Sequence, residues 1–552
     1  MTGPRRPARP HGARLGLTAR LVALVRKPPR LATPTLIAAV SVFNAAVYHA
    51  PLLAFANVRL DSLSGAGLLT LATLLVLVSV ATAAVLAAIC LVSQRLLKPV
   101  CIGAAFLNAV ALYFMQGYGV VLDKSMMGNV LNTNFAEAAD LWHPRLGLYL
   151  LVFGLAPSLV LWWIGVRAIA RTRLVAFAVV LVAGCLAWLY AASSTWLWID
   201  KHARALGGLI LPWSYTVNAV RYQSSKWAAA RQATLLPDAH FIGDAKVVVV
   251  LVIGESARAS NFSMYGYARR TNPELSAAGA VALPNTQACA TYTTQALMCI
   301  LSHDDPGLRL AGSVELLPSY LQRHGVEVIW RSNNWGEPPL RVSSYERAEQ
   351  IQKTCIGERC SHDELLLDGL ANRIRTAKAR KVLVVLHQSG SHGPSYSTKY
   401  PPGFEMFHPV CNSVDLSQCS SQALLNTYDN TIFYTDHVVG RAIGILKELP
   451  DVPSTLLYIS DHGESLGEHG LYLHGTPKAM APDVQTQIPF IVWMSEAFKR
   501  QMGTDEAQLA RGLAHSQANV FHSVMGAVQM RSQVYAPRLD VFGSPPLKGA
   551  PR

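Results

Sequence analysis

Two different patterns of apolar and polar positions divide the chain near residue 240. The first half contains five long apolar segments, each near the ~20 residues that a helix needs to cross the hydrocarbon core of a membrane. They cover approximately residues 34–55, 66–92, 99–122, 146–166 and 174–198. The second half alternates short apolar runs with longer amphipathic stretches. The contrast predicts an N-terminal transmembrane domain of five helices, followed by a C-terminal α/β domain.

The short apolar runs of the second half are typical of buried strands in a parallel sheet. They cover residues 247–253, 326–330, 381–386, 455–459 and 489–493, and helix-like stretches such as 363–379 and 424–449 lie between them. Alternation of this kind predicts a mostly parallel sheet with helices on both faces.

The distribution of charge indicates how the chain is oriented in a membrane. Arginine and lysine crowd the first 30 residues, which contain no acidic residue. Basic loops also follow the second and fourth apolar segments, whereas the loops after the first and third carry acidic residues. The positive-inside rule then places the N-terminus in the cytoplasm and, after five crossings, the second half on the opposite side. The long first segment and the further spans argue against a cleaved signal peptide.

These patterns predict four regions along the chain. Residues 1–33 form a basic cytoplasmic N-terminus, and residues 34–198 form the transmembrane domain. Residues 199–240 mix basic and aromatic side chains, which suits an amphipathic connector on the membrane face. Residues 241–545 form the extracytoplasmic α/β domain.

Composition narrows the functional class. The chain is 51% hydrophobic and 15% charged, which is too apolar for an ordinary soluble protein. Its net charge of +14 would suit a nucleic-acid partner, but the basic leader before the first span explains that charge better, so no nucleic acid is expected. A transporter or membrane scaffold would carry charged residues inside the spans, and the five segments contain essentially none.

Acidic residues follow two of the predicted strands. Glu255 comes directly after the run that begins at Val247, and Asp461-His462 follows the run that begins at Thr455. If these strands are neighbours, the three side chains converge at the carboxyl edge of the sheet, where α/β proteins bind ligands. Two carboxylates and an imidazole suit a divalent metal, zinc first. The alternative is that they are ordinary strand-end residues that cap turns.

Six of the nine cysteines form close pairs in the second half of the chain. The pairs are Cys289 with Cys299, Cys355 with Cys360, and Cys411 with Cys419, while Cys90, Cys101 and Cys185 lie in or beside the apolar segments. Locally paired cysteines in an exported domain predict disulfides. A cysteine zinc site is the weaker alternative, because no CxxC spacing occurs.

Threonine and histidine supply further candidate chemistry. The loop between Cys289 and Cys299 contains Thr293, whose hydroxyl becomes a nucleophile if a metal or a base lowers its pKa. His392 lies in the stretch HQSGSHGP after a predicted strand, and His474 follows the Asp461-His462 motif. These histidines could bind a second metal or a phosphoryl group, although a lone histidine is more often structural.

A polar stripe occupies the long loop after the third apolar segment. Asn129, Thr133 and Glu137 recur every four residues, so they share one face if the loop is helical. Such a stripe at the membrane surface could bind a lipid headgroup. A solvated interfacial helix is the plainer interpretation, and the spacing favours it.

Several motifs together resemble those of a known enzyme family. GESARASNFSMYGYARRTNP, the Cys289–Cys299 loop, HQSGSHGP and SDHGESLGEHGLYLHG are similar to the lipid A phosphoethanolamine transferases, a group that includes the mobilised colistin-resistance enzymes. The resemblance covers nearly the whole chain. It implies an alkaline phosphatase/sulfatase-like catalytic domain in the periplasm of a multi-pass protein of the bacterial inner membrane. Ethanolamine amines added to lipopolysaccharide reduce the negative charge that antimicrobial cationic peptides bind.

The resemblance also implies a role for individual residues. Thr293 would be the nucleophile that takes phosphoethanolamine from phosphatidylethanolamine and passes it to lipid A through a covalent intermediate. Zn²⁺ would be held by Glu255, Thr293, Asp461 and His462. Substrate or a second metal would be bound by His392, His474, Asn334, Asn129, Thr133 and Glu137. The stripe of the long loop would thus be a headgroup site after all, and a monomer is expected.

The segment after Asn333-Asn334 differs from the family pattern. Pro338 stands where the family commonly has a lysine, and Arg341 is the nearest cation along the chain. Rival functions are transfer of phosphoglycerol, transfer of phosphoethanolamine to another periplasmic glycan, and sulfatase-like hydrolysis. The Cys/Ser-x-Pro-x-Arg motif of sulfatases is absent from the sequence.

Overall fold

A computed structural model describes residues 28–60, 64–133, 141–229, 234–304, 314–510 and 514–543. The chain separates into two compact units. The first comprises Met1–Tyr113, Arg145–Leu206 and Ile210–Pro212, and the second comprises Phe114–Pro144, Gly207–Leu209 and Trp213–Arg552. Residues 114–133 fall inside the range that the apolar pattern assigns to the transmembrane domain, yet they belong to the same compact unit as the α/β domain.

Long apolar helices build the first unit. Four helical stretches are long and apolar enough to cross a membrane: Gly65–Val92 (α4), Gln94–Tyr118 (a 3-10 turn and α5, Leu97–Tyr118), Pro144–Trp163 and Arg171–Ala191 (α10). The third of these contains α8 (Pro144–Tyr149), a π-helical stretch and α9 (Ala156–Trp163). The described part of the chain therefore contains four such helices, and a fifth span depends on a bent pair.

That bent pair replaces the single first span expected from the sequence. Helices α2 (Thr33–Val47) and α3 (Ala50–Arg59) meet at an angle of 54°. Pro51 lies in the first turn of α3 and has no N–H to donate to the carbonyl of Val47, so a continuous helix is disfavoured. Buried polar groups occupy the break: His49 Nδ1 is 3.0 Å from the Asn44 carbonyl oxygen, and Asn108 donates to Asn44 Oδ1 at 2.9 Å.

The last predicted span is shorter than its apolar pattern suggests. Helix α10 ends at Ala191, and a short 3-10 turn leads into α11 (Trp196–Leu209). The apolar residues Trp196–Trp198 therefore begin a new helix. Helix α12 (Trp213–Ala229) follows, so two helices occupy most of the range that was expected to form a connector.

A seven-stranded sheet organises the second unit. Its order is β5-β13-β10-β4-β9-β7-β8. In that order the strands are Val281–Ala282, Phe490–Met494, Ser454–Ser460, Val247–Gly254, Lys381–His387, Glu327–Ser332 and Ser344–Arg347. All five apolar runs predicted as strands are strands of this sheet, and two short strands, β5 and β8, extend its edges.

The sheet is mixed rather than purely parallel. The strands from β10 to β8 pair in parallel, whereas β13 runs antiparallel to both β10 and β5. Between β10 and β13 the chain forms the hairpin of β11 (Ser465–Leu466) with β12 (Tyr472–Leu473) and the short helix α19 (Asp483–Thr486). A parallel pair needs a crossover back to the opposite edge of the sheet. The chain makes no such crossover here. Strand β13 therefore starts at the carboxyl edge of the sheet, where β10 ends, and runs antiparallel to β10.

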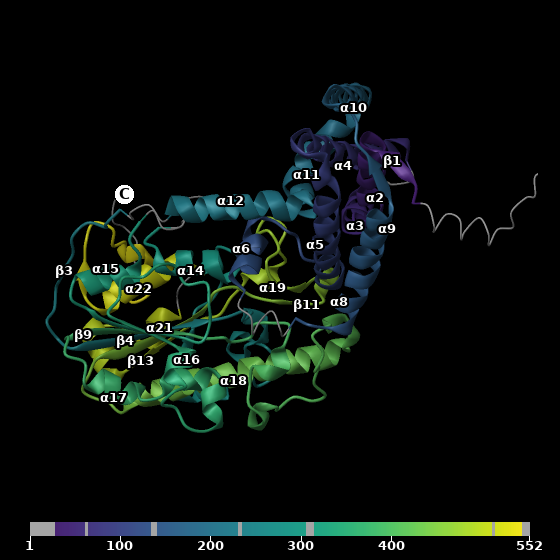
Figure 1. Cartoon of the computed structure of the whole chain (residues 1–552). Coiled ribbons are helices and arrows are strands. Elements are labelled where there is room, and N and C mark those ends of the chain that lie inside the picture. Colours follow the sequence, from purple (N-terminus) through teal and green to yellow (C-terminus); the bar gives the residue numbers. More distant parts are fainter. Residues whose placement is uncertain are drawn as a thin grey trace, which may run out of the picture. The chain divides into compact units, whose positions relative to one another are not determined.

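Helices cover both faces of this sheet (Figure 1). One face packs against α14 (Thr293–Leu301), α15 (Leu317–Arg323) and α22 (Ala518–Ala527), whose apolar side chains share one buried core with alternate residues of β4, β7 and β9. The long helix α18 (Ser421–Lys447) lies on the other face, and it corresponds to the helix predicted at residues 424–449.

One predicted helix of this unit is broken. The stretch 363–379 contains a 3-10 turn at Asp363–Leu367 and the short helix α17 (Leu370–Arg375). Gly369 separates them with a φ of 62°, in the left-handed region that interrupts a right-handed helix.

Candidate active site

Glu255 and Asp461 leave the sheet side by side. Strands β4 and β10 are parallel neighbours, with Gly254 opposite Ser460. The N–H of Asp461 donates to the Gly254 carbonyl at 3.0 Å, so the pairing continues past the strand ends. Both carboxylates are fully buried. The apolar strands thus bring two acidic side chains to one point at the carboxyl edge of the sheet.

Both carboxylates lie close to the same ring nitrogen of His462. His462 Nε2 lies 3.3 Å from Glu255 Oε1 and 3.2 Å from Asp461 Oδ2. The other oxygen of Asp461 accepts hydrogen bonds from the N–H groups of Ser256 and His462, at 3.0 and 2.7 Å. Ser256 has a φ of 54°, a strained conformation for a non-glycine residue and one that often marks functional sites.

Two buried polar atoms at this point are suited to binding a cation. His462 Nδ1 lies 3.0 Å from the Gly463 carbonyl oxygen, so Nδ1 carries the proton and Nε2 keeps its lone pair. Burial lowers the pKa of His462 to about 3, so the ring is neutral near pH 7. Neither His462 Nε2 nor Asp461 Oδ2 has a hydrogen-bond donor within the described residues. Buried polar atoms are rarely left without a partner, and a metal ion would satisfy both.

His474 joins the same cluster. The candidate ligand atoms of Glu255, His462 and His474 all lie within 4.8 Å of one another. His474 Nδ1 lies 2.8 Å from Glu464 Oε2, an arrangement that fixes the ring of a metal-binding histidine. Carboxylate and imidazole donors at this spacing fit zinc. Sequence reasoning missed Glu464, although it stands within the Asp461-His462-Gly463-Glu464 motif.

The ionisation of the carboxylates also favours a cation. Burial raises the pKa of Glu255, but His462, His392 and His474 outweigh it and hold that pKa below its ordinary value. Burial and the neighbouring Glu255 charge raise the pKa of Asp461 well above its ordinary value. Two carboxylates this close cannot both ionise easily, and a divalent cation would allow it.

Thr293 faces this cluster from the first position of α14. Its Oγ1 donates a hydrogen bond to Glu255 Oε2 at 3.1 Å, and the residue is 1% exposed. The disulfide between Cys289 and Cys299 ties the preceding loop to the helix, as its spacing predicts. Apolar residues of α14 pack into the core, so the hydroxyl is held on a rigid element.

Asn334 approaches Glu255 from the end of β7. Its Nδ2 donates to the same Glu255 Oε2 at 2.8 Å and to the Gln388 carbonyl at 2.8 Å. Gly336 follows with a φ of 87°, and a Cβ added there would lie 3.5 Å from Thr293 Cγ2. The segment that departs from the family pattern therefore lies directly against Thr293.

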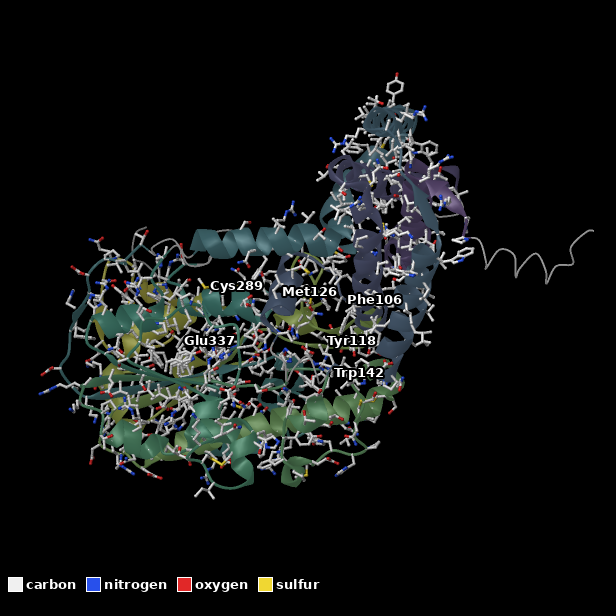
Figure 2. All side chains as sticks on the ribbon, viewed as in Figure 1. Phe106, Tyr118, Met126, Trp142, Cys289 and Glu337 are labelled. Carbon is white, nitrogen blue, oxygen red and sulfur yellow. A yellow bond between two sulfur atoms is a disulfide. The ribbon has the colours of Figure 1, made fainter. Side chains whose placement is uncertain are left out.

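Glu337 anchors this segment to the end of β9. Its Oε1 lies 2.8 Å from His387 Nδ1 and also accepts from Ser332 Oγ, deep in the α/β unit (Figure 2). The side chains of Glu337 and His387 are almost completely buried. His387 is thus part of a structural network, as expected for a lone histidine.

His392 lies on a tight turn after β9. The N–H of Ser391 donates to the Glu255 carbonyl at 2.9 Å, and Asp363 accepts from the N–H groups of Ser389 and Gly390, both at 2.8 Å. The His392 and His474 ring centroids are 5.2 Å apart. Sequence reasoning missed Asp363, because it acts through the backbone of a turn that lies far from it in the sequence.

The polar stripe of the long loop is described in part. Asn129 lies on α6 (Lys124–Asn132), is 8% exposed and has no hydrogen-bond partner at Oδ1 among the described residues. Its Nδ2 lies 4.0 Å from the position of a Cβ at Gly475, next to His474. The Thr133 hydroxyl bonds the Asn129 carbonyl at 2.8 Å. Glu137 lies outside the described residues.

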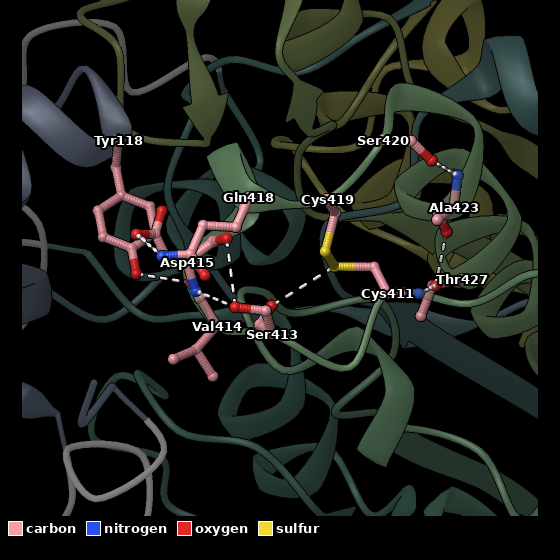
Figure 3. The surroundings of a disulfide bond; sticks show 10 residues. All are labelled: Tyr118, Cys411, Ser413, Val414, Asp415, Gln418, Cys419, Ser420, Ala423 and Thr427. Carbon is pink, nitrogen blue, oxygen red and sulfur yellow. Dashed lines mark hydrogen bonds between the residues drawn. A yellow bond between two sulfur atoms is a disulfide. The ribbon is translucent and has the colours of Figure 1, made fainter. Parts of the chain in front are cut away.

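The other two predicted disulfides are also present, between Cys355 and Cys360 and between Cys411 and Cys419. The loop of the second bridge contacts Tyr118 at the end of α5, whose hydroxyl donates to the Val414 carbonyl at 2.7 Å (Figure 3). Cys90, Cys101 and Cys185 are free.

Known proteins share this architecture over most of the chain. Residues 77–227 match the family model described as phosphoethanolamine transferase EptA/EptB, and residues 248–530 match the model described as sulfatase. Phosphoethanolamine transferase EptA of Helicobacter pylori is 39% identical over 90% of this chain and 94% of its own length. The chain belongs to the phosphoethanolamine transferase family.

Other relatives agree with this assignment. Phosphatidylethanolamine transferase Mcr-1 of Escherichia coli is 31% identical to this transferase over 72% of the chain and 79% of its own length. The solved integral membrane lipooligosaccharide phosphoethanolamine transferase A of Neisseria meningitidis has a TM-score of 0.84 at 28% identity, covering 93% of this chain and 99% of that chain. The match to the Neisseria meningitidis protein extends over both compact units of this transferase.

Proposed function

We propose that the protein transfers phosphoethanolamine from phosphatidylethanolamine to lipid A in two steps, with Thr293 as the nucleophile. The hydrogen bond from Thr293 Oγ1 to Glu255, beside Asp461 and His462, is the observation that carries the proposal. Family membership supports the substrates, because EptA and Mcr-1 are named as transferases of this group. The protein acts as an integral membrane enzyme whose catalytic domain faces the periplasm.

A zinc ion would be held by Glu255, Asp461 and His462 together with the Thr293 oxygen, and His474 lies close enough to contribute. Zn²⁺ bound there would lower the pKa of the Thr293 hydroxyl and offset negative charge on the phosphoryl oxygens. The donor set and the two unpartnered buried atoms support this assignment.

The chain's own residues position the reacting groups. Thr293 presents its hydroxyl from the rigid start of α14, with the proton directed at Glu255 Oε2. Its oxygen forms a bond to the donor phosphorus, the bond to diacylglycerol breaks, and the proton passes to the leaving alkoxide. An acceptor oxygen on lipid A then bonds to the same phosphorus, the bond to Thr293 breaks, and Thr293 regains a proton. His392 and Asn334 would bind the phosphoryl oxygens during both steps.

The donor headgroup would bind beside α6. Asn129 is nearly buried next to the His474 loop, and its Oδ1 has no partner among the described residues, so it can accept a hydrogen bond from an ethanolamine ammonium group. Thr133 and Glu137 would complete this subsite. The membrane unit, with five spans if α2 and α3 cross as one, would keep the site within reach of both lipids. The proposal keeps the four regions expected from the sequence, which are residues 1–33, 34–198, 199–240 and 241–545. It also includes a monomeric state.

Mass spectrometry of lipid A tests the proposal. The full chain, a Thr293→Ala variant and a Thr294→Ala control would be expressed in a Gram-negative host. Lipid A should gain one phosphoethanolamine unit with the wild type and the control but not with Thr293→Ala. Unmodified lipid A together with Thr293-dependent release of diacylglycerol would redirect the proposal to another glycan acceptor. Absence of both signals in the wild type would refute transferase activity and favour a hydrolase.

A further inference from the structure

Lys399 is a cation at the edge of the candidate site that has no role in the mechanism above. Its Nζ donates a hydrogen bond to Ser389 Oγ at 3.1 Å. None of the ion pairs found among the described residues involves Lys399. An ammonium group carries three donors, so this neutral partner leaves both the charge and further hydrogen-bonding capacity available.

Ser389, whose hydroxyl accepts from Lys399, belongs to a turn that is hydrogen-bonded to Glu255 of the candidate metal site. The His392 N–H donates to the Ser389 carbonyl at 3.3 Å. In the same turn, the Ser391 N–H donates to the Glu255 carbonyl at 2.9 Å. Asp363 holds the Ser389 and Gly390 N–H groups. Ser389, the hydrogen-bond partner of Lys399, is therefore held near Glu255 and His392 by backbone hydrogen bonds.

Two arginines of the same unit are already neutralised by carboxylates. Arg258 pairs with Glu468 at 2.6 Å, and Arg269 pairs with Asp429 at 2.7 Å. Arg341, the cation nearest in sequence to the altered segment, is exposed, and its backbone N–H bonds Ser319. Lys399 differs from the first two because no ion pair among the described residues offsets its positive charge.

The chemistry of the two substrates indicates which of them needs this charge. Phosphatidylethanolamine brings one phosphate, which becomes the group on Thr293, and a cationic amine. A phosphorylated acceptor brings a second anionic group next to the first, and two such charges repel each other at short range. A lysine ammonium near the site offsets this repulsion and forms charge-assisted hydrogen bonds to phosphate oxygens.

We propose that Lys399 binds the phosphate group of the acceptor and thereby promotes the second step of transfer. The inference rests on the proposed function. In this step an oxygen of the acceptor phosphate bonds to the phosphorus on Thr293, the bond between that phosphorus and Thr293 Oγ1 breaks, and the acceptor's proton returns to Thr293. The product is a diphosphate linkage. The ligand of Lys399 is a phosphate monoester, whether on lipid A itself or on an attached sugar.

Separate assays of the two steps test this role. The full chain in detergent micelles containing phosphatidylethanolamine is assayed for single-turnover release of diacylglycerol without an acceptor. Transfer to lipid A is then followed by mass spectrometry. Lys399→Met removes the charge, Lys399→Arg restores it, and Lys378→Met is the matched control, because this exposed lysine precedes the amino end of β9.

Lys399→Met should lower kcat/KM for lipid A about 10- to 100-fold, as expected for loss of charge-assisted hydrogen bonds. It should leave the first step within about twofold, and Lys399→Arg should recover most of the loss. Unchanged transfer by Lys399→Met, or an equal loss in both steps, would overturn the inference. Equally fast modification of dephosphorylated lipid A by the wild type would also overturn it. Absence of diacylglycerol release from the wild type would instead refute the proposed function.

Discussion

The sheet edge and helix α6 both contribute to the proposed site, but they are held in place by different means. Glu255 and Asp461 follow strands that pair along seven residues of β10. Asn129 lies on a helix of nine residues, too short to be stable without neighbours. Helix α6 is held by side chains: Tyr222 of α12 contacts Gly128 and Asn132, and Met126 reaches Gly475.

Under the proposed function, the more rigid sheet edge carries the reacting groups and α6 carries the binding site for the donor headgroup. Reacting groups tolerate little displacement, and strands fixed by a backbone ladder supply that precision. A headgroup subsite on a short helix can adjust to a lipid that arrives from the membrane, because elements with few buried contacts open at low free-energy cost. Substitutions at the sheet edge should therefore lower kcat and metal content, whereas substitutions around α6 should raise KM for the donor.

The largest effect is expected at Asp461. Asp461→Asn keeps the shape of the side chain but removes the charge at the oxygen that faces His462 Nε2. Bound zinc, measured by elemental analysis, should fall below half an ion per chain. Turnover should fall at least about 100-fold, the upper end for residues that act around a metal. Asp451→Asn, on the exposed turn before β10, should match the wild type in both measurements.

Gly390→Ala should break the backbone that supports Glu255. The new Cβ would lie 2.7 Å from the Glu255 carbonyl oxygen, and φ is 50°. Clash and strain together should lower the free energy of unfolding by about 2–4 kcal/mol, measured by urea denaturation and tryptophan fluorescence. Gly266→Ala isolates the strain, because φ is 90° there and nothing lies within 4 Å of the Cβ. Equal losses in the two variants would contradict the proposed clash.

Gly128→Ala should affect recognition more than stability. Its Cβ would lie 2.9 Å from the ring of Tyr222, so α6 must move away from α12. A shift of this kind should raise KM for phosphatidylethanolamine about tenfold with little change in kcat. The control is Gly117→Ala in α5, where the Cβ meets open space. A drop in zinc content in Gly128→Ala would show that α6 and the sheet edge are not independent.

Tyr222→Phe should give the smallest change. It removes the hydroxyl that Asn132 Nδ2 contacts at 2.5 Å but keeps the ring against Gly128. Loss of one partly exposed hydrogen bond should raise KM for the donor about threefold, measured by steady-state release of diacylglycerol. A larger effect than that of Gly128→Ala would mean that the hydroxyl, rather than the close approach of the ring, holds α6.

Local patterns in the sequence predicted much of the α/β unit. Unbroken apolar runs such as Val247–Ile253 identified buried strands, and the carboxylates that follow them identified the sheet edge. The three disulfides followed from close cysteine pairs. Each of these features depends on residues that lie close together in the sequence, so a local pattern is enough to predict it.

Features set by distant contacts were not predicted. The antiparallel entry of β13 depends on the path of the chain between two strands, which apolar periodicity does not record. The break at His49 depends on one proline, and the apolar pattern continues across it. Glu464 and Asp363 escaped notice because they act through His474 and through a backbone turn. The roles of Asn334 and the α6 stripe came from family resemblance and stay predictions.

The disulfide between Cys289 and Cys299 encloses Thr293, the proposed nucleophile, and joins its loop to α14. Such bridges form outside the cytoplasm, where thiols are not kept reduced. Core packing holds α14 itself, but the covalent link between the loop and the helix is completed only after the second half of the chain has been exported. Oxidation outside the cytoplasm therefore adds a restraint on the segment around Thr293 that a newly made chain lacks.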